Sequence, residues 1–256
     1  MAVAGAGAEF PGPRADKRVG LPDRVADALG RRIVSGTIAH GHVIPTEPEI
    51  QSEFGVSRTA VREAVRLLSA KGLTETRPKT GTRVRPPSDW NLLDPDVLGW
   101  HLADKPAPHF IEDLFEMRLI FEPAAAEIAA ERADPGMLAR MQTAMDAMAA
   151  APRGSLAQVE ADLAFHKAIL EASGNLLLRS LGSLIESALS VTFGLNWRAR
   201  STSHEDRIEM HRTVLDAIKS GKARQAGLAM HRLIDSSRSD SMAAVNRVAA
   251  KEKVPV

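Results

Sequence analysis

The sequence predicts a mainly α-helical protein in which a winged helix-turn-helix precedes an all-α helical bundle. Three observations lead to this fold class. Between residues 21 and 87, helical patterns separated by a glycine turn are followed by a basic hairpin. From Pro108 onward, apolar residues recur at helical spacing almost without a break, and no run alternates as a half-buried strand does. The 256 residues are 44% hydrophobic, which suits one large domain or two of ordinary size.

The composition excludes several classes of protein. The chain has no Cys, which rules out a disulfide-stapled module, an iron–sulfur site and a thiolate nucleophile. No apolar run approaches the roughly 20 residues needed to cross a bilayer, and residues 1–20 lack the apolar stretch of a signal peptide. We therefore expect a soluble, cytoplasmic protein without a membrane partner.

Breaks rich in Pro and Gly divide the chain into four segments. Residues 1–20 offer almost nothing to bury, which predicts a disordered leader. Residues 21–87 form a compact unit, and residues 88–108 predict a linker with one short helix. Residues 109–250 predict a bundle of about six helices. Its breaks fall at Asp134 to Gly136, Pro152 to Gly154, Ser173 to Asn175, Arg200 to Ser203 and Ser220 to Gly221.

The unit of residues 21–87 has the spacing of a helix-turn-helix followed by a wing. Its expected elements are a helix through Val25, Leu29 and Ile33, a short helix from Thr46, a turn at Gly55-Val56, a helix from Ser57 to about Lys71, and a hairpin that pairs Leu73 to Thr76 with Thr82 to Arg85. The side chains of Thr46 and Ser57 are suited to capping the helices that they precede.

Basic residues gather on the helix after the turn and at the tip of the hairpin. Arg58, Arg62 and Arg66 are spaced by four residues, so they lie on one stripe. Residues 21–87 hold eleven Lys and Arg against seven Asp and Glu, whereas the rest of the chain has a slight acidic excess. Three arginines alone are also typical of a solvated face. The capped helix, the glycine turn and the basic hairpin together favour DNA binding.

This unit resembles the winged helix of GntR-type bacterial regulators in three runs: Gly55 to Leu68 (GVSRTAVREAVRLL), Lys71-Gly72-Leu73 and Gly81-Thr82-Arg83-Val84. The resemblance implies that the unit binds double-stranded operator DNA. The residues expected at the DNA are Ser57, Arg58, Thr59 and Arg62 on the helix, and Lys79 and Gly81 in the wing.

The bundle carries polar side chains on faces that are otherwise apolar. Asp162 and His166 are four residues apart on one helix, so their side chains project together. His211 and Arg118 each lie within an apolar stripe of another helix. Taken singly, such residues are more often an ordinary helix pair or a satisfied core histidine. Together they predict one polar chamber for a ligand or a metal, because a buried charge is costly unless it is paired or bound. Trp197 is a further candidate, since an indole face suits a sugar chain.

The bundle resembles the FCD effector domain of the FadR branch of GntR regulators in four places: Phe115 to Ala125 (FEMRLIFEPAA), Asp162 to His166, Ser173 to Asn175 and His211. The segment from Asp89 to Trp100 is similar to the linker of D-galactonate-type regulators, which respond to sugar acids. These resemblances imply a ligand-responsive regulator whose bundle binds a small carboxylate.

The FCD resemblance also implies a divalent metal held by one Asp and three His. Three of these ligands are matched, by Asp162, His166 and His211. The fourth falls near Leu233, and the nearest histidine is His231, which a rotation of about 200° should turn away from the chamber. Two alternatives follow. Either Zn²⁺ or a similar ion is held with positions open for the effector, or these residues bind the effector directly with Arg118 as its carboxylate partner.

The sequence therefore predicts a homodimeric transcriptional regulator and not an enzyme. The favoured mode is a repressor that a sugar acid such as D-galactonate releases from a pseudo-palindromic operator. Two rival functions are a small metallohydrolase built on the Asp/His/His cluster and an effector-independent DNA-binding protein with an inert bundle. The metallohydrolase lacks a clear general base beside the three candidate ligands.

Overall fold

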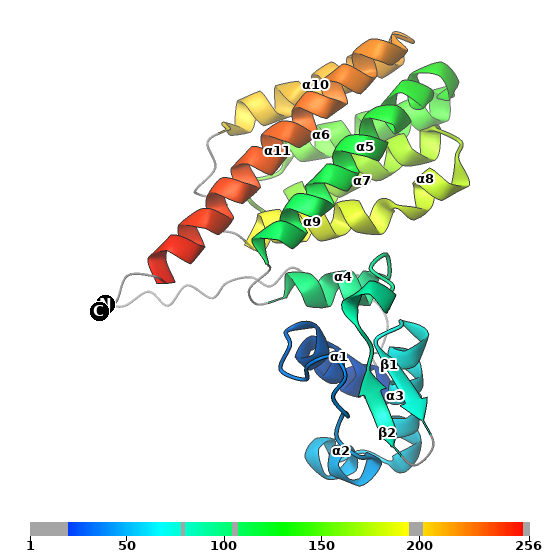
Figure 1. Ribbon diagram of the computed structural model, residues 1–256. Helices are drawn as coiled ribbons and strands as arrows, with labels where there is room; N and C mark the ends of the chain where they lie inside the picture. The colour runs from blue at the N-terminus through cyan, green and yellow to red at the C-terminus, as the bar shows by residue number, and fades with distance from the viewer. Residues whose placement is uncertain (1–19, 78–79, 104–106, 195–201, 253–256) are drawn as a thin grey trace. The chain divides into compact units, whose positions relative to one another are not determined.

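The computed structural model describes residues 20–77, 80–103, 107–194 and 202–252. The chain forms two compact units, whose boundary in the sequence lies between Pro106 and Ala107. The N-terminal unit combines helices with a two-stranded sheet, and the C-terminal unit is a helical bundle (Figure 1). This is the mainly α-helical fold that the sequence predicts. No described helix is both long and apolar enough to cross a membrane.

The N-terminal unit contains the elements expected of a winged helix. They are α1 (Leu21–Val34), α2 (Glu47–Phe54), α3 (Arg58–Ala70), β1 (Thr74–Arg77) and β2 (Gly81–Val84). The two strands pair antiparallel, with Thr74 opposite Val84. An isolated bridge between Val43 and Arg83, which the sequence did not predict, joins the segment before α2 to the sheet.

Local side-chain chemistry sets the turn between α2 and α3. Glu49 closes the first turn of α2 by accepting a hydrogen bond from the backbone N–H of Thr46 at 2.7 Å. Gly55 ends α2 with a φ of 63°, a left-handed conformation that suits glycine. Ser57 then caps α3 by accepting from the N–H of Ala60. α3 packs on both α1 and α2, so this turn fixes how α3 is presented.

The segment after the wing contains the short helix that the sequence predicts within a linker, and this helix packs onto α1. The segment consists of η1 (Pro87–Asp89) and α4 (Pro95–Leu102). The indole of Trp100 lies so close to Gly30 that an added Cβ would come within 2.5 Å of the ring. The Nε1 of Trp100 also donates to the Asp27 carboxylate at 2.8 Å. A buried aromatic contact and a specific hydrogen bond therefore hold α4 within the N-terminal unit.

The C-terminal unit has seven described α-helices where the sequence predicts about six. They are α5 (Pro108–Arg132), α6 (Pro135–Ala150), α7 (Leu156–Ala172), α8 (Leu176–Ser180), α9 (Gly182–Gly194), α10 (His204–Lys219) and α11 (Ala223–Glu252). Each predicted break falls where one of these helices gives way to the next, although Pro135 and Gly136 already belong to α6. The additional helix arises because the chain also breaks at Leu181, beside Gly182, a break that the sequence analysis did not predict.

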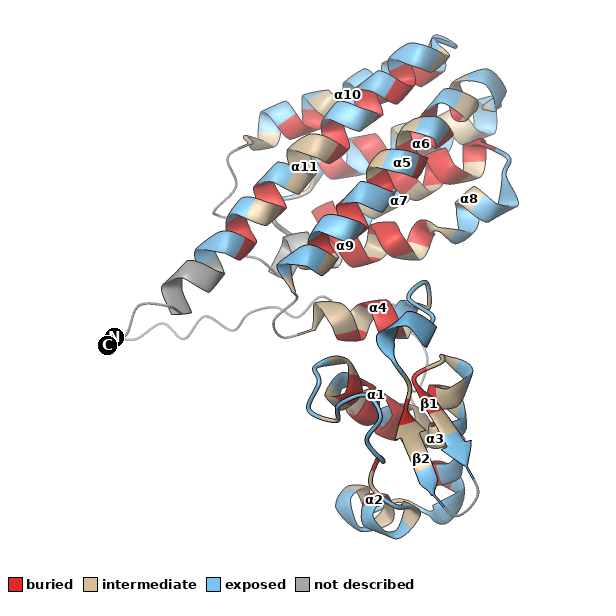
Figure 2. Ribbon diagram, in the orientation of Figure 1, coloured by how far each residue is buried: buried red, intermediate tan, exposed pale blue. Residues whose placement is uncertain are grey.

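The bundle encloses a mostly apolar interior with a polar centre. α5 packs along α11, α6 along α7, and α10 along α11 (Figure 1). Buried residues lie on the inward sides of these helices and exposed residues on the outer sides (Figure 2). The buried charged residues and histidines come from four of the helices, and they are Arg118, Glu122, His166, Arg207, His211 and Asp240.

Candidate DNA-binding surface and buried polar chamber

The exposed side of α3 carries the three arginines that the sequence places on one stripe. The side chains of Arg58, Arg62 and Arg66 are 74%, 70% and 68% exposed. The Nε of Arg58 lies 2.8 Å from the carboxylate of Glu47, and the Nε of Arg62 lies 3.9 Å from it. Ion pairs this exposed contribute little to stability, so these arginines can exchange Glu47 for another anion at small cost.

The other residues expected at the DNA lie at the start of α3 and in the wing. Ser57 and Thr59 are exposed at the N-terminal end of α3. Gly81 begins β2 with a φ of 83°, and a Cβ there would lie 3.0 Å from the side chain of Val43. Glycine is therefore needed at this position for the backbone of the wing itself. Lys79 lies outside the described residues.

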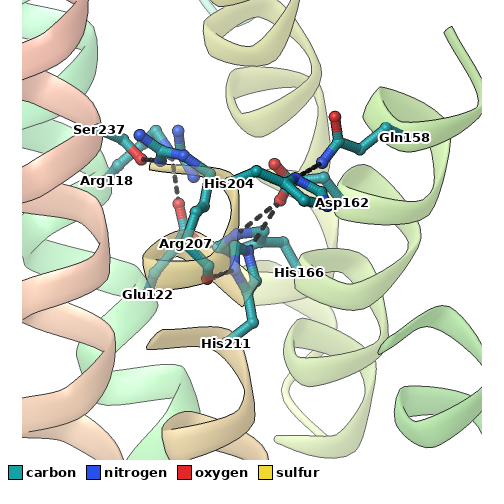
Figure 3. A network of polar contacts seen from close by, with 9 residues as sticks. All are labelled: Arg118, Glu122, Gln158, Asp162, His166, His204, Arg207, His211 and Ser237. Atoms are coloured by element: carbon teal, nitrogen blue, oxygen red, sulfur yellow. Dashed lines mark hydrogen bonds and ion pairs between the residues drawn. The ribbon is translucent and has the colours of Figure 1, made fainter. Parts of the chain in front are cut away.

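Three candidate metal ligands meet inside the bundle (Figure 3). The Oδ1 of Asp162 lies 3.2 Å from the Nε2 of His166, and both residues lie on α7. The same oxygen lies 3.2 Å from the Nε2 of His211 on α10. One ligand atom from each residue lies within 4.8 Å of the others, and both histidines are buried. The structure thus brings together the three residues that the sequence selects.

The second nitrogen of each imidazole ring has its own acceptor. The Nδ1 of His166 donates to the Oε2 of Glu122 on α5 at 2.5 Å. The Nδ1 of His211 donates to the backbone carbonyl of Arg207 at 2.7 Å. A hydrogen bond at Nδ1 selects the tautomer and directs the Nε2 lone pair. Both Nε2 atoms are therefore held as candidate ligands beside the carboxylate of Asp162.

Arg118 is held beside this cluster by Glu122. Its Nε donates to the Oε1 of Glu122 at 2.5 Å, and the two side chains are 1% and 2% exposed. The guanidinium also lies over the ring of Phe115, at 5.4 Å from the ring centroid. This hydrogen bond uses Nε, so the two terminal amino groups of Arg118 are not engaged by Glu122. Arg118 therefore keeps two donors with which it can bind an anion.

The charges in the chamber stabilise one another. Burial opposes the ionisation of Glu122, but Arg118 and His166 outweigh burial and lower the pKa of its carboxyl. Burial also opposes the charge on Asp162, yet His211 and His166 hold its pKa well below the usual range. Burial disfavours charged His166, but Glu122 and Asp162 raise its pKa to about 9. With these groups alone, the carboxylates are charged and His166 is protonated at neutral pH.

Sequence reasoning missed the acidic partners of the buried arginines. Arg207 on α10 pairs with Asp240 on α11 at 2.6 Å. It also donates to Ser237 at 2.7 Å (Figure 3). The sequence carries a signal for Glu122, because it follows Arg118 by four residues on one helix. No spacing reveals the pair of Arg207 and Asp240, since it joins two different helices.

The position expected for a fourth metal ligand holds no donor. Leu233 is buried on α11, and His231, two residues earlier, is exposed, as the rotation of a helix predicts. Trp197 lies outside the described residues. Within the part of the chain that the structure describes, the candidate ligands are Asp162, His166 and His211.

Two family models match the chain. The model for bacterial regulatory proteins of the gntR family matches residues 21–84, which include α1 to β2. The FCD domain model matches residues 113–236, which include the chamber residues of α5, α7 and α10. The two matches therefore fall on the two compact units.

Individual proteins resemble the chain over most of its length. The galactonate operon transcriptional repressor of Escherichia coli K12 is 36% identical over 211 residues, which cover 81% of this chain and 92% of the relative. The putative L-lactate dehydrogenase operon regulatory protein of the same strain is 32% identical over 218 residues, which cover 82% of each. Among solved structures, Lar, which controls the expression of the Listeria monocytogenes agr system, is similar in fold. Its TM-score is 0.59 at 18% identity, and the match covers 91% of this chain and 100% of Lar.

Proposed function

The chain belongs to the gntR family of bacterial regulatory proteins and carries an FCD domain, and we propose that it represses transcription until a hydroxycarboxylate binds the chamber. The family consists of DNA-binding transcription regulators, so the chain is not a metallohydrolase. The favoured effector is a sugar acid such as D-galactonate. The observation that carries this proposal is a buried arginine, Arg118, whose two terminal amino groups are not engaged by Glu122 and which lies beside three candidate metal ligands.

We assign operator binding to α3 and the wing. Arg58 and Arg62 have the length and the paired donors for bidentate hydrogen bonds to guanine in the major groove. Their exposed contacts with Glu47 are weak enough to be exchanged for bases or phosphates. The full set assigned to DNA is Ser57, Arg58, Thr59, Arg62, Lys79 and Gly81.

A divalent metal, with Zn²⁺ favoured, fits the donors of the chamber. A carboxylate oxygen of Asp162 and the Nε2 atoms of His166 and His211 are ordinary zinc ligands, and the hydrogen bonds at Nδ1 direct both lone pairs. Three protein ligands leave coordination positions for an effector. When bound, Zn²⁺ supplies a Lewis-acidic centre for carboxylate and hydroxyl oxygens.

Charge balance favours an effector with one negative charge. The charged residues described in the chamber are the cations Arg118 and Arg207 and the anions Glu122, Asp162 and Asp240. If His166 is neutral as a ligand, a divalent metal leaves this group with one positive charge in excess. A single carboxylate removes the excess, and the two terminal amino groups of Arg118 match its two oxygens.

The names of two relatives agree with this chemistry. One is named for a galactonate operon and the other for an L-lactate dehydrogenase operon. Galactonate and lactate both carry a hydroxyl next to a carboxylate, an arrangement that chelates a metal and leaves oxygen lone pairs for a guanidinium. A neutral sugar offers the hydroxyls without the charge that the chamber requires.

We expect a homodimer, because a two-fold protein reads the two half-sites of a pseudo-palindromic operator. Effector binding then changes operator affinity through a coupling free energy of about 1–3 kcal/mol. By linkage, operator binding changes effector affinity by the same factor.

The proposal is tested with an operator selected from random duplex DNA by the Zn²⁺-loaded protein. Fluorescence anisotropy then measures operator affinity with D-galactonate, L-lactate and the uncharged sugar D-galactose. We expect a hydroxycarboxylate to weaken binding by roughly 5- to 150-fold and D-galactose to have no effect. Unchanged affinity with every acid would leave an effector-independent DNA-binding protein and refute the proposed regulation.

A further inference from the structure

Glu122 lies between the proposed effector-binding arginine and a proposed metal ligand. Its Oε1 accepts from the Nε of Arg118 at 2.5 Å, and its Oε2 accepts from the Nδ1 of His166 at 2.5 Å. The exposed fractions of these three side chains are only 1% to 2%. The two oxygens of one buried carboxylate therefore each hold a different partner, and Glu122 links α5 to α7 (Figure 3).

The two histidines of the cluster differ in what holds their Nδ1. For His211, the acceptor is the backbone carbonyl of Arg207, one turn earlier on the same helix, so it is present whenever α10 forms. For His166, the acceptor is the side chain of Glu122 on another helix. The orientation of His166 thus depends on a residue that is not itself among the candidate ligands.

We propose that Glu122 is a positioning residue of the metal centre, which orients His166 for metal binding and links it to Arg118. The inference rests on the metal site proposed above. A carboxylate that accepts from Nδ1 keeps the lone pair on Nε2 and makes that nitrogen a stronger donor. Because Arg118 shares the same carboxylate, an effector that engages Arg118 also alters the hydrogen bond to His166. Metal and effector binding are then coupled through Glu122.

The first test measures the Zn²⁺ affinity of the full chain by competition with a chromophoric chelator. We expect Glu122→Gln to bind Zn²⁺ about 10- to 100-fold more weakly than the wild type, the range found when such outer partners are removed. The matched control is Glu116→Gln, which removes a carboxylate from the exposed side of the same helix. Its Zn²⁺ affinity should equal that of the wild type.

The second test separates positioning from a general effect on structure. In Zn²⁺-loaded protein with ¹⁵N-labelled histidine, the Nδ1–H protons of His166 and His211 should both exchange slowly with solvent. In Glu122→Gln the His166 signal should shift and exchange faster, whereas the His211 signal should stay, because its backbone acceptor is unchanged. A merely structural role would disturb both signals or neither.

Three outcomes are decisive. If Glu122→Gln fails to fold because Arg118 is left unpaired, the double variant Arg118→Met/Glu122→Gln removes both charges and should show the same 10- to 100-fold loss. Wild-type Zn²⁺ affinity in the variant, with an unchanged His166 signal, overturns the role of Glu122 and leaves the metal site standing. Failure of the wild type to bind Zn²⁺ overturns the metal site itself, and this inference with it.

Discussion

Arg58 on α3 and Arg118 in the bundle are each paired with a glutamate, yet they occupy opposite environments. The side chain of Arg58 is 74% exposed, 2.8 Å from Glu47, whereas that of Arg118 is 1% exposed, 2.5 Å from Glu122. Water screens the first pair, so its partner is exchangeable. The second pair is inaccessible to water, so losing either member leaves an uncompensated buried charge. The comparison indicates that α3 is built to exchange anions and that the chamber is built to keep a fixed charge arrangement.

The sharpest test of this contrast replaces each arginine with methionine. Arg118→Met should lower the free energy of unfolding by about 3–5 kcal/mol, because Glu122 loses its buried cation. Arg58→Met should change it by no more than about 0.5 kcal/mol. Urea denaturation followed by circular dichroism measures both. The double variant Arg118→Met/Glu122→Gln should recover most of the loss, and equal effects at the two arginines would contradict the contrast.

Metal loading should stabilise the bundle through the chamber alone. Zn²⁺ at 100 times its dissociation constant is expected to add about 2.7 kcal/mol to the free energy of unfolding. His211→Ala should abolish this gain, because it removes one of three candidate ligands. His231→Ala is the matched control, since His231 is exposed on α11. Thermal unfolding with and without Zn²⁺ provides the measurement, and a gain that survives His211→Ala would place the metal elsewhere.

The difference between local contacts and contacts across helices explains which features the sequence could predict. α3 and its turn depend on local signals such as the cap at Ser57 and the glycine at Gly55, so their bounds follow from spacing. The sequence also indicates that Asp162 and His166 lie together, because residues four positions apart on one helix are neighbours. The pair of Arg207 and Asp240 joins helices that meet only in the folded bundle, and no local pattern encodes it.

The sequence could not predict that α4 packs on α1, for a related reason. Its contact depends on a glycine in α1, Gly30, that leaves space for the indole of Trp100. No sequence pattern predicts contact between a glycine within a helix and a tryptophan seventy residues later. Proline and aspartate around residues 94–106 predicted a linker with one short helix, without indicating that α1 is the helix that it packs on.

Operator binding should depend on α3 and be insensitive to arginines elsewhere. Arg62→Ala is expected to weaken binding to the selected operator by about 1–3 kcal/mol and to relax specificity at one base pair. Arg140→Ala is the matched control, because Arg140 is also an exposed arginine paired with a glutamate, Glu171 on α7. Anisotropy on the operator and on single-base variants measures both. Equal losses for the two variants would show that binding reflects overall charge and not α3.

In the metal-free protein, the chamber should also make the free energy of unfolding depend on pH. The exposed arginines should have no such effect. The folded state raises the pKa of His166 from 6.5 to about 9, so this group stabilises the protein fully below pH 6.5 and its contribution is lost as the pH rises through 9. The expected slope is about 1 kcal/mol per pH unit within that window. Denaturation of chelator-treated protein from pH 6 to 9.5 measures it. His166→Gln should make the free energy of unfolding nearly independent of pH within that window, whereas Arg58→Met should leave its pH dependence unchanged. An equally steep curve for His166→Gln would mean that another group titrates, and the buried charge network would then not control stability in this range.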